Sequence, residues 1–468
     1  MLPDPGQSTL IIMPVMHHIA FIHYQVGHTD GVSLEIEKWQ RVLEEMGHRT
    51  HLVAGDLGRA QGTLIPAMHH HRPEARRLYR NTFIALSDYE DERAYRRELF
   101  ERADEIEREL RRALEEQHVD FLIPQNVWSV GVHPSVAIAL ARVQQDMALP
   151  AVAHHHDFYW ERPDGVALTC SSAVELADKY LPPRNRGIRH VVINSLAQAE
   201  LAARKGLYAT VVPNIFDFEA PPWQRDDYNA DFRRAIGLRE NDVLILQATR
   251  VIARKGIELA IDFVRALDSP RRRAELARRG LYDGRAFDDD SRIVYVLAGY
   301  TRDDPGGEYV RRLHRKIART GIDALFIEDH VASERSRHQG RKLYSLWDTY
   351  VCADLVTYPS LWEGWGNQFL EAVRGRLPIV LFEYPVYAAD IKDKGFDVIS
   401  LGSTISGRDD LGLVQVDPAQ IEAAADEAVE VLTDARRRQE MVEHNYALAR
   451  EHYSLPALRR YLSQLLKS

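Results

Sequence analysis

Apolar and polar positions follow two rhythms along this chain, and together they predict strands alternating with helices. Short apolar runs such as Val243 to Gln247 have the length and composition of strands buried on both faces of a parallel sheet. Between such runs, apolar residues recur three and four positions apart, as from Val32 to Met46, which is one face of an amphipathic helix that Gly47 can end. The pattern therefore predicts an α/β fold.

The same rhythm predicts the remaining elements. Helices are expected over 91–117, from Ser195, from Ile257 and from Ile421 onward. His17 to Asp30 and Leu57 to Tyr89 are expected to be loops, and Pro270 to Asp290 is a charged insertion without an assigned structure. Further strands are predicted at Thr9 to Val15, Arg49 to Ala54, Val119 to Pro124, Arg189 to Asn194, Arg292 to Ala298, Leu325 to His330, Asp354 to Tyr358, Leu377 to Phe382 and Asp397 to Leu401.

The strand–helix rhythm begins again in the second half of the chain, which predicts two domains. A chain of 468 residues is too long for one ordinary core. Pro221 to Asp231 carries two prolines and several charges, so the boundary is placed there. We expect doubly wound domains at 1–220 and 221–450, and a C-terminal helix at 451–468 that packs back on the first domain.

Composition narrows the class of protein. Hydrophobic residues make up 45% of the chain and charged residues 28%, as in a globular protein, and a net charge of −9 argues against nucleic-acid binding. Cys170 and Cys352 are too few for a disulfide framework and lack metal-ligand spacing. No apolar run is long enough for a transmembrane helix, and the start lacks a basic signal-peptide region. We expect a cytoplasmic protein without integral membrane association.

One stretch, Pro359 to Ala372, carries a clear chemical pattern. It follows a predicted strand, passes through a glycine-bearing loop and enters a predicted helix, an arrangement that offers free backbone N–H groups to an anion. Glu363 in the loop and Glu371 in the helix can each accept hydrogen bonds from two hydroxyl groups, as on a sugar or a ribose. The pattern indicates a nucleotide-sugar site.

The order Ser-x-x-Glu-Gly-x-Gly, with a second glutamate eight residues after the first, resembles the Glu-x7-Glu signature of glycosyltransferase family 4. The match continues through Ala372 to Val380. Arg250 and Lys255, after the strand at 243–247, resemble the family's pair of cations that grips the donor diphosphate, although Thr249 stands where the family usually has glycine. The resemblance implies the GT-B fold, two Rossmann-like domains facing across a cleft, and a retaining enzyme.

In the first domain the resemblance is shorter. His156-Asp157 resembles the family's His-Asp pair beside the transferred sugar, and the loop at Gly31 resembles its first glycine-containing loop. Strand alternation puts His154 and His156 on one face and His155 on the other. The alternatives are that the histidines form a buried pair whose hydrogen bonds are satisfied within the protein, and that Gly31 is an ordinary turn glycine. The strings 29–35 and 154–162 resemble mannosylglucosylglycerate-type synthases, which make compatible solutes.

The resemblance and the positions of strand ends give a set of candidate site residues. The triplet His69 to His71 is expected to be a solvated loop, since neighbouring side chains point in different directions. No metal site is expected. Candidates for catalysis are His156, Asp157, Glu363, Arg250 and Lys255; for donor binding Gly31, Arg250, Lys255, Gly299, Gly364, Gly366, Asn367, Gln368 and Glu371; and for acceptor binding Asn126, Trp128 and Tyr159.

The resemblance implies transfer of a hexosyl group from a GDP- or UDP-linked sugar to a hydroxyl group of a small polar acceptor, such as a glycoside or a glycerate derivative. No cofactor or metal is expected beyond the nucleotide-sugar co-substrate, and the protein could form a homo-oligomer. A retaining double displacement would need a nucleophile, and no residue stands out for that role, so a same-face mechanism is favoured. The alternatives are a sugar-nucleotide epimerase, a GT-B phosphorylase and a non-catalytic nucleotide-sugar-binding subunit.

Overall fold

The computed structural model describes residues 16–161, 166–338 and 340–467, and it divides into two compact units. Unit 1 comprises 1–191, 201–210 and 462–468, and unit 2 comprises 192–200 and 211–461. The strand predicted at Thr9 to Val15 lies outside the described residues. The domain bounds proposed from the sequence stay a prediction.

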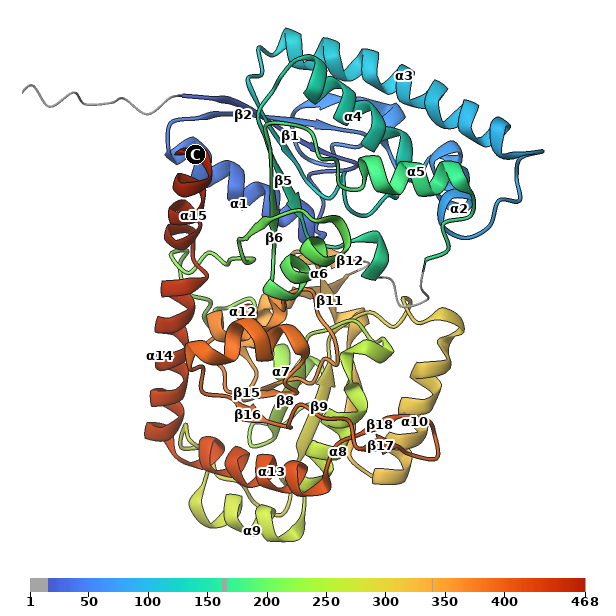
Figure 1. Ribbon diagram of the computed structural model, residues 1–468. Coiled ribbons are helices and arrows are strands. Elements are labelled where there is room, and N and C mark those ends of the chain that lie inside the picture. The colour runs from blue at the N-terminus through green and yellow to red at the C-terminus, as the bar shows by residue number, and fades with distance from the viewer. Residues whose placement is uncertain (1–15, 162–165, 339, 468) are drawn as a thin grey trace, which may run out of the picture. The chain divides into compact units, whose positions relative to one another are not determined.

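Unit 1 is built on a seven-stranded sheet in the order β3-β2-β1-β4-β5-β6-β7 (Figure 1). The loop predicted from His17 to Asp30 is wrong in its first part, because His18–His23 forms an interior strand, paired in parallel with β2 and β4. Histidines at both ends of this strand hid its apolar centre. The strands are β1 (His18–His23), β2 (Arg49–Ala54), β3 (Thr63–Leu64), β4 (Phe121–Pro124), β5 (Ala151–His155), β6 (Ile188–Val192) and β7 (Ala209–Val211).

The helices predicted from Val32 to Met46, over 91–117 and at Ser195 are present in unit 1, whereas α4 and α5 were not predicted. Asp30 caps α1 by accepting hydrogen bonds from the N–H groups of Val32 and Ser33. Helix α2 was missed within the predicted loop, because its apolar face is short. The helical elements are α1 (Gly31–Glu45), a turn at Pro66–Met68, α2 (Pro73–Phe83), α3 (Glu92–Glu116), α4 (Pro134–Asp146), a turn at Tyr159–Glu161, α5 (Ser171–Tyr180) and α6 (Ser195–Lys205), which runs across both units.

Unit 2 is built on a six-stranded parallel sheet in the order β10-β9-β8-β14-β15-β16. The sequence places the centres of these strands correctly, except that the strand predicted at 325–330 ends at Phe326 and is followed by a helical turn. The strands are β8 (Val243–Gln247), β9 (Ile293–Leu297), β10 (Asp323–Phe326), β14 (Leu355–Tyr358), β15 (Ile379–Leu381) and β16 (Ile399–Ser400).

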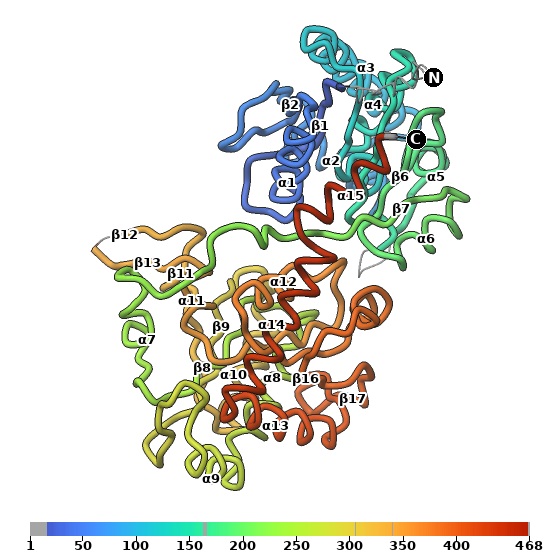
Figure 2. Tube along the Cα trace, turned by 90° about the vertical axis from the view of Figure 1, so that its left-hand side faces the viewer, coloured from blue at the N-terminus to red at the C-terminus, as the bar shows by residue number. Residues whose placement is uncertain are grey.

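Two small sheets complete unit 2. One joins β11 (Val331–Ala332), β13 (Arg341–Ser345) and β12 (Ser336–His338), and Figure 2 shows it beside the helix that follows β13. The other joins β17 (Gly407–Arg408) and β18 (Val414–Gln415). The sequence did not predict either sheet.

The helices of unit 2 include α9 within the segment that the sequence left unassigned. Helix α15 begins in unit 2, and its last residues belong to unit 1. The helical elements are α7 (Phe232–Ala235), α8 (Ile257–Leu267), α9 (Pro270–Arg279), α10 (Glu308–Thr320), α11 (Leu346–Val351), α12 (Asn367–Arg374), α13 (Pro418–Thr433), α14 (Ala435–His452), α15 (Leu455–Lys467) and shorter turns at Ala253–Lys255, Pro305–Gly307, Glu328–His330, Tyr387–Ile391 and Lys392–Lys394.

Each large sheet has its first strand in the interior and reverses its strand order beside it, between β1 and β4 in unit 1 and between β8 and β14 in unit 2. Such a reversal leaves a crevice at the carboxyl ends of the two strands, where open α/β sheets bind ligands. The predicted doubly wound α/β class is confirmed. Among the described residues, none of the helices combines the length and apolar character needed to cross a membrane.

Candidate functional site

In unit 2, the loops that follow β8 and β14 are joined at the carboxyl edge of the sheet. The N–H of Leu361 donates to the carbonyl oxygen of Arg254 at 2.8 Å. Gly256 has a φ of 59°, and a Cβ there would lie 2.1 Å from the carbonyl oxygen of Pro359. Glycine is therefore required where the two loops meet, and the contact fixes the cations of one loop beside the carboxylate of the other.

A buried ion pair lies at this junction. The Lys255 Nζ donates to Glu363, and both side chains are almost fully buried. The Arg254 guanidinium donates to the same carboxylate at 2.8 Å. Burial by itself would raise the pKa of Glu363, but the charges of Lys255 and Arg254 outweigh it and hold that pKa below its usual value. Glu363 is thus an ionised acceptor of hydrogen bonds.

Arg254 is a contributor that sequence reasoning missed. It stands immediately before Lys255 in the chain, so the Arg-Lys-Gly order was a signal that the prediction did not use. Arg250 was predicted, and it lies apart from this pair: its side chain is 48% exposed and forms an ion pair with Asp303 at 3.1 Å.

The glycine loop after Glu363 leads into α12. Gly366 has a φ of 126°, and a Cβ there would lie 2.1 Å from the Tyr384 hydroxyl group, so a larger residue does not fit. Asn367 is the first residue of α12, and the first N–H groups of a helix have no acceptor within it. Neighbouring side chains fix the loop: the Asn194 amide donates to the Gly364 carbonyl oxygen at 2.7 Å.

Glu371 lies in the second turn of α12, and Gln368 lies at its start, partly exposed. The Tyr350 hydroxyl group, on α11, donates to Glu371 Oε2 at 2.8 Å. Tyr350 is only 1% exposed, so a hydroxyl group from the interior of unit 2 holds the partly buried carboxylate of Glu371. Tyr350 is a second residue that the sequence did not single out.

Gly299, the other predicted glycine, lies just after β9. A Cβ there would lie 1.7 Å from the carbonyl oxygen of Thr249, so the backbone of the Gly299 turn packs directly on the loop that follows β8. This packing supports the loop that carries Arg250 and Lys255.

In unit 1, the carboxyl ends of β4 and β5 bring Gln125, Asn126 and His156 together. Asn126 Oδ1 accepts from the N–H of His156 at 2.7 Å and from the N–H of Asp157 at 3.3 Å. His156 Nε2 and Gln125 Oε1 are 2.9 Å apart, so the imidazole donates from Nε2 to the amide oxygen. Burial lowers the pKa of His156 to about 3, which keeps the ring neutral at pH 7.

Alternation along β5 separates the three histidines as predicted. The ring of His154 stacks on Trp39 at 4.4 Å and lies 4.2 Å from the ring of His156. His155 faces the other side, where its Nε2 lies 3.0 Å from His190 Nδ1. Asp157 is exposed at the end of the strand. His156 and Asp157, two of the predicted catalytic residues, therefore follow the end of β5. Gln125, which bonds to His156, was not predicted from the sequence.

The other candidates of unit 1 differ in their surroundings. Gly31 is the exposed first residue of α1, next to the capping residue Asp30. Tyr159 is half-buried in a helical turn, with its ring 5.5 Å from that of Phe83. Trp128 is fully buried, and its indole N–H donates to the carbonyl oxygen of Ala137, so we assign it to the core and not to a binding surface.

In the triplet His69 to His71, the first two histidines are partly buried and His71 is exposed. Burial, together with the charges of neighbouring histidines, lowers the pKa of His70 to about 4. Within the part of the chain that the structure describes, no group of three histidine, cysteine or carboxylate side chains is arranged to hold a metal ion.

Comparison with known proteins places this geometry in a family. Residues 229–448 match the model of glycosyl transferases group 1. The chain is 37% identical to mannosylglucosylglycerate synthase of Petrotoga mobilis over 419 residues, covering 89% of this chain and 93% of the relative. It is 36% identical to mannosylglucosylglycerate synthase of Thermotoga maritima over 447 residues, covering 95% of this chain and 99% of the relative.

Solved structures of similar fold include a glycosyltransferase from Rickettsia africae, at a TM-score of 0.59 and 11% identity, over 97% of this chain and 98% of that one. Anabaena HepE in complex with UDP and glucose has a TM-score of 0.57 at 14% identity, over 97% of this chain and all 100% of that one. These similarities extend over both units, and the fold is GT-B with two Rossmann-like domains.

Proposed function

Since this chain belongs to the group 1 glycosyl transferases, together with the two mannosylglucosylglycerate synthases, and is a hexosyltransferase, we propose that it moves a hexosyl group from a GDP- or UDP-linked sugar to a glycerate-type acceptor. The names of the relatives favour a mannosyl group as the transferred sugar and a glucosylglycerate as the acceptor. The observation that carries the proposal is the ionised, buried Glu363 between Lys255 and Arg254, at the point where the strand order of unit 2 reverses.

In the proposed donor complex, Glu363 accepts hydrogen bonds from hydroxyl groups of the transferred sugar, and Glu371 accepts them from the ribose. The diphosphate lies at the N-terminus of α12, against the amides near Gly364, Gly366, Asn367 and Gln368. Lys255 and Arg250 supply positive charge as the diphosphate departs. In the protein without bound donor, the Glu363 carboxylate neutralises the charge of Lys255.

Unit 1 provides the proposed acceptor side and the sugar-binding histidine. His156 is neutral at pH 7, so it can exchange hydrogen bonds with a sugar hydroxyl group without adding charge. The backbone N–H of Asp157 donates to Asn126, which fixes the position of Asp157. In the proposed complex, Asp157 orients either the sugar hydroxyl group or the acceptor. Gly31 and Tyr159 are the other proposed contacts on this side.

The proposed chemistry retains the anomeric configuration. The bond between the anomeric carbon and the donor phosphate oxygen breaks, the acceptor oxygen bonds to the same face of that carbon, and the acceptor proton passes to the leaving diphosphate. No carboxylate nucleophile is required. Fixed cations and helix N–H groups stabilise the diphosphate, so we propose that transfer does not require a metal.

Product analysis tests the function directly. GDP-mannose, UDP-mannose, GDP-glucose and UDP-glucose would each be incubated with glucosylglycerate, with EDTA and separately with Mg²⁺. We expect one donor to yield nucleoside diphosphate and a product heavier by one hexosyl group, and NMR should show the anomeric configuration of the donor in the product.

The variants Lys255→Ala and Glu363→Gln should lose transfer, whereas Lys392→Ala, on a surface ion pair of the same unit, should retain it. A product of inverted configuration would refute the same-face mechanism. Absence of transfer with all four donors, or full activity in Lys255→Ala, would refute the assigned site.

A further inference from the structure

A cavity lies in unit 2 at the amino ends of β8 and β14. Its volume is about 760 Å³, and its lining comes from the segments before β8, after α9 and before β14. Arginine dominates its walls: five arginines but only three carboxylates line it. The proposed transfer reaction uses none of these residues.

Two of the arginines are fixed by a buried carboxylate. Arg233 donates to Asp354 Oδ2 at 3.2 Å, and Arg285 donates to Asp354 Oδ1. Asp354 is 2% exposed, and its backbone N–H and one carboxylate oxygen also tie it to Leu244 in β8. Arg233 and Arg285 therefore form a rigid floor, and their charges largely neutralise Asp354 and the nearby Asp283.

Three more arginines surround this floor without such compensation. Arg225, Arg234 and Arg239 are exposed, and in the described part of the chain none of them forms an ion pair. Arg239 donates to the carbonyl oxygen of Asp290 at 2.6 Å, and in the described residues all three guanidinium groups line the cavity without a salt bridge.

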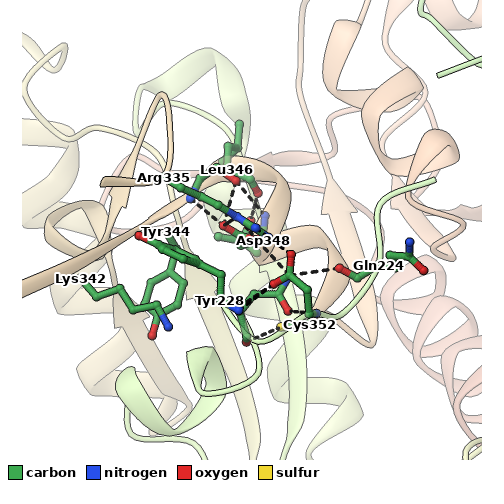
Figure 3. Close-up of polar contacts among 12 residues, drawn as sticks. Gln224, Tyr228, Arg335, Lys342, Tyr344, Leu346, Asp348 and Cys352 are labelled. Atoms are coloured by element: carbon green, nitrogen blue, oxygen red, sulfur yellow. Dashed lines mark hydrogen bonds and ion pairs between the residues drawn. The ribbon is translucent and has the colours of Figure 1, made fainter. Parts of the chain in front are cut away.

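The wall that carries Arg225 is held in place by a polar network (Figure 3). Arg335 and Asp348 point toward one another, and Arg335 Nε donates to Asp348 at 3.1 Å. Asn229 Nδ2 donates to the same carboxylate at 3.0 Å, and the Cys352 thiol donates to the Asn229 carbonyl oxygen at 3.9 Å. The segment around Arg225 is therefore fixed to α11 rather than left as a free linker.

Guanidinium groups bind phosphate through paired N–H donors, and a phosphate monoester carries close to two negative charges at pH 7. The cavity is also within the range of ~300–1,000 Å³ typical of small-molecule sites, which is larger than a lone phosphate ion needs. We propose that this cavity binds a phosphorylated small molecule, with its phosphate group at Arg225, Arg234 and Arg239.

The proposed site is separate from the donor site. The cavity borders the amino ends of β8 and β14, whereas Lys255 and Glu363 follow their carboxyl ends. A five-residue strand spans roughly 16 Å at ~3.3 Å per residue. Because β14 begins at the Asp354 floor and ends at the Glu363 loop, a ligand here can influence donor binding along one strand.

Titration calorimetry and thermal shift with inorganic phosphate, a hexose phosphate and the unphosphorylated hexose test this proposal in a low-salt chloride buffer. The hexose phosphate should bind and raise the melting temperature more than inorganic phosphate, and the plain hexose should not bind. Arg225→Ala combined with Arg234→Ala should weaken hexose phosphate binding tenfold or more. Both side chains are exposed and form no salt bridge in the described residues, so folding should be preserved.

Two variants make the outcome specific. Lys255→Ala should lose nucleoside diphosphate binding and keep hexose phosphate binding. The Arg225/Arg234 double variant should lose hexose phosphate binding and keep nucleoside diphosphate binding. Arg436→Ala removes an arginine that is 86% exposed and should change neither. Loss of phosphate binding in Lys255→Ala, unchanged affinity in the double variant, or no binding of either phosphate by the wild type would overturn the proposal, whichever result the transfer assay gives.

Discussion

Removing Lys255 should destabilise unit 2 strongly, because its partner would remain buried. Lys255 and Glu363 have side chains that are 3% and 8% exposed. Taking one member away from a buried ion pair costs about 3–5 kcal/mol. Glu363 would keep its 2.8 Å contact with Arg254, so we expect the lower end, about 3 kcal/mol, for Lys255→Ala.

A thermal scan converts this value into an observable. For a unit of this size, 1 kcal/mol moves the melting temperature by about 2–4 °C, so the transition of unit 2 should fall by roughly 6–12 °C. Lys392→Ala breaks a pair whose lysine is 57% exposed, and such surface pairs contribute about 0–1 kcal/mol, so its transition should move by no more than about 4 °C.

The pH dependence provides an independent check. The folded-state pKa of Glu363 lies below its unfolded value, so its contribution to stability is complete above the unfolded pKa and is lost as the pH falls through the folded pKa. Lys255→Ala should raise the folded pKa and shrink this contribution. If Lys255→Ala melts within 2 °C of the wild type at pH 7, the buried pair is not intact in solution and the account of the site is wrong.

Three further predictions concern other parts of the structure. Tyr350→Phe removes the hydroxyl group that fixes Glu371, so we expect donor KM to rise by about five- to tenfold while kcat is retained, and a loss of kcat alone would contradict this role. Gly256→Ala should lower the free energy of unfolding by more than about 2 kcal/mol, because it combines a positive φ with a backbone clash. Gly237 also has a positive φ but open space around it, so Gly237→Ala should cost only about 1–2 kcal/mol. Equal losses of unfolding free energy in denaturant titrations of the two variants would disprove the clash. Burial lowers the pKa of His190 to about 4, so its contribution to the stability of unit 1 is complete above pH 6.5 and is lost as the pH falls toward 4. The melting temperature of His190→Gln should therefore depend less on pH in that window than the melting temperature of the wild type. Equal pH dependence of the two melting temperatures would refute the assignment.

Local patterns predicted most elements of the fold. The apolar runs at β8, β9 and β14 and the stripes of α1 and α8 define their elements within a few residues, because burial on a strand or a helix face repeats at short intervals. β1 was missed because histidines at its ends made the run Thr9 to Val15 the stronger apolar signal.

The sequence by itself also determined the loop chemistry around Glu363 and Glu371, since strand, glycine turn and helix follow one another within a few residues. Only the tertiary structure decided that Arg254 shares Glu363 with Lys255, that Tyr350 supports Glu371, and that Trp128 belongs to the core. Arg254 and Glu363 are 109 residues apart in the chain. They meet because β8 and β14 are neighbours in the sheet, and strand order is set by the packing of the whole unit rather than by any local pattern.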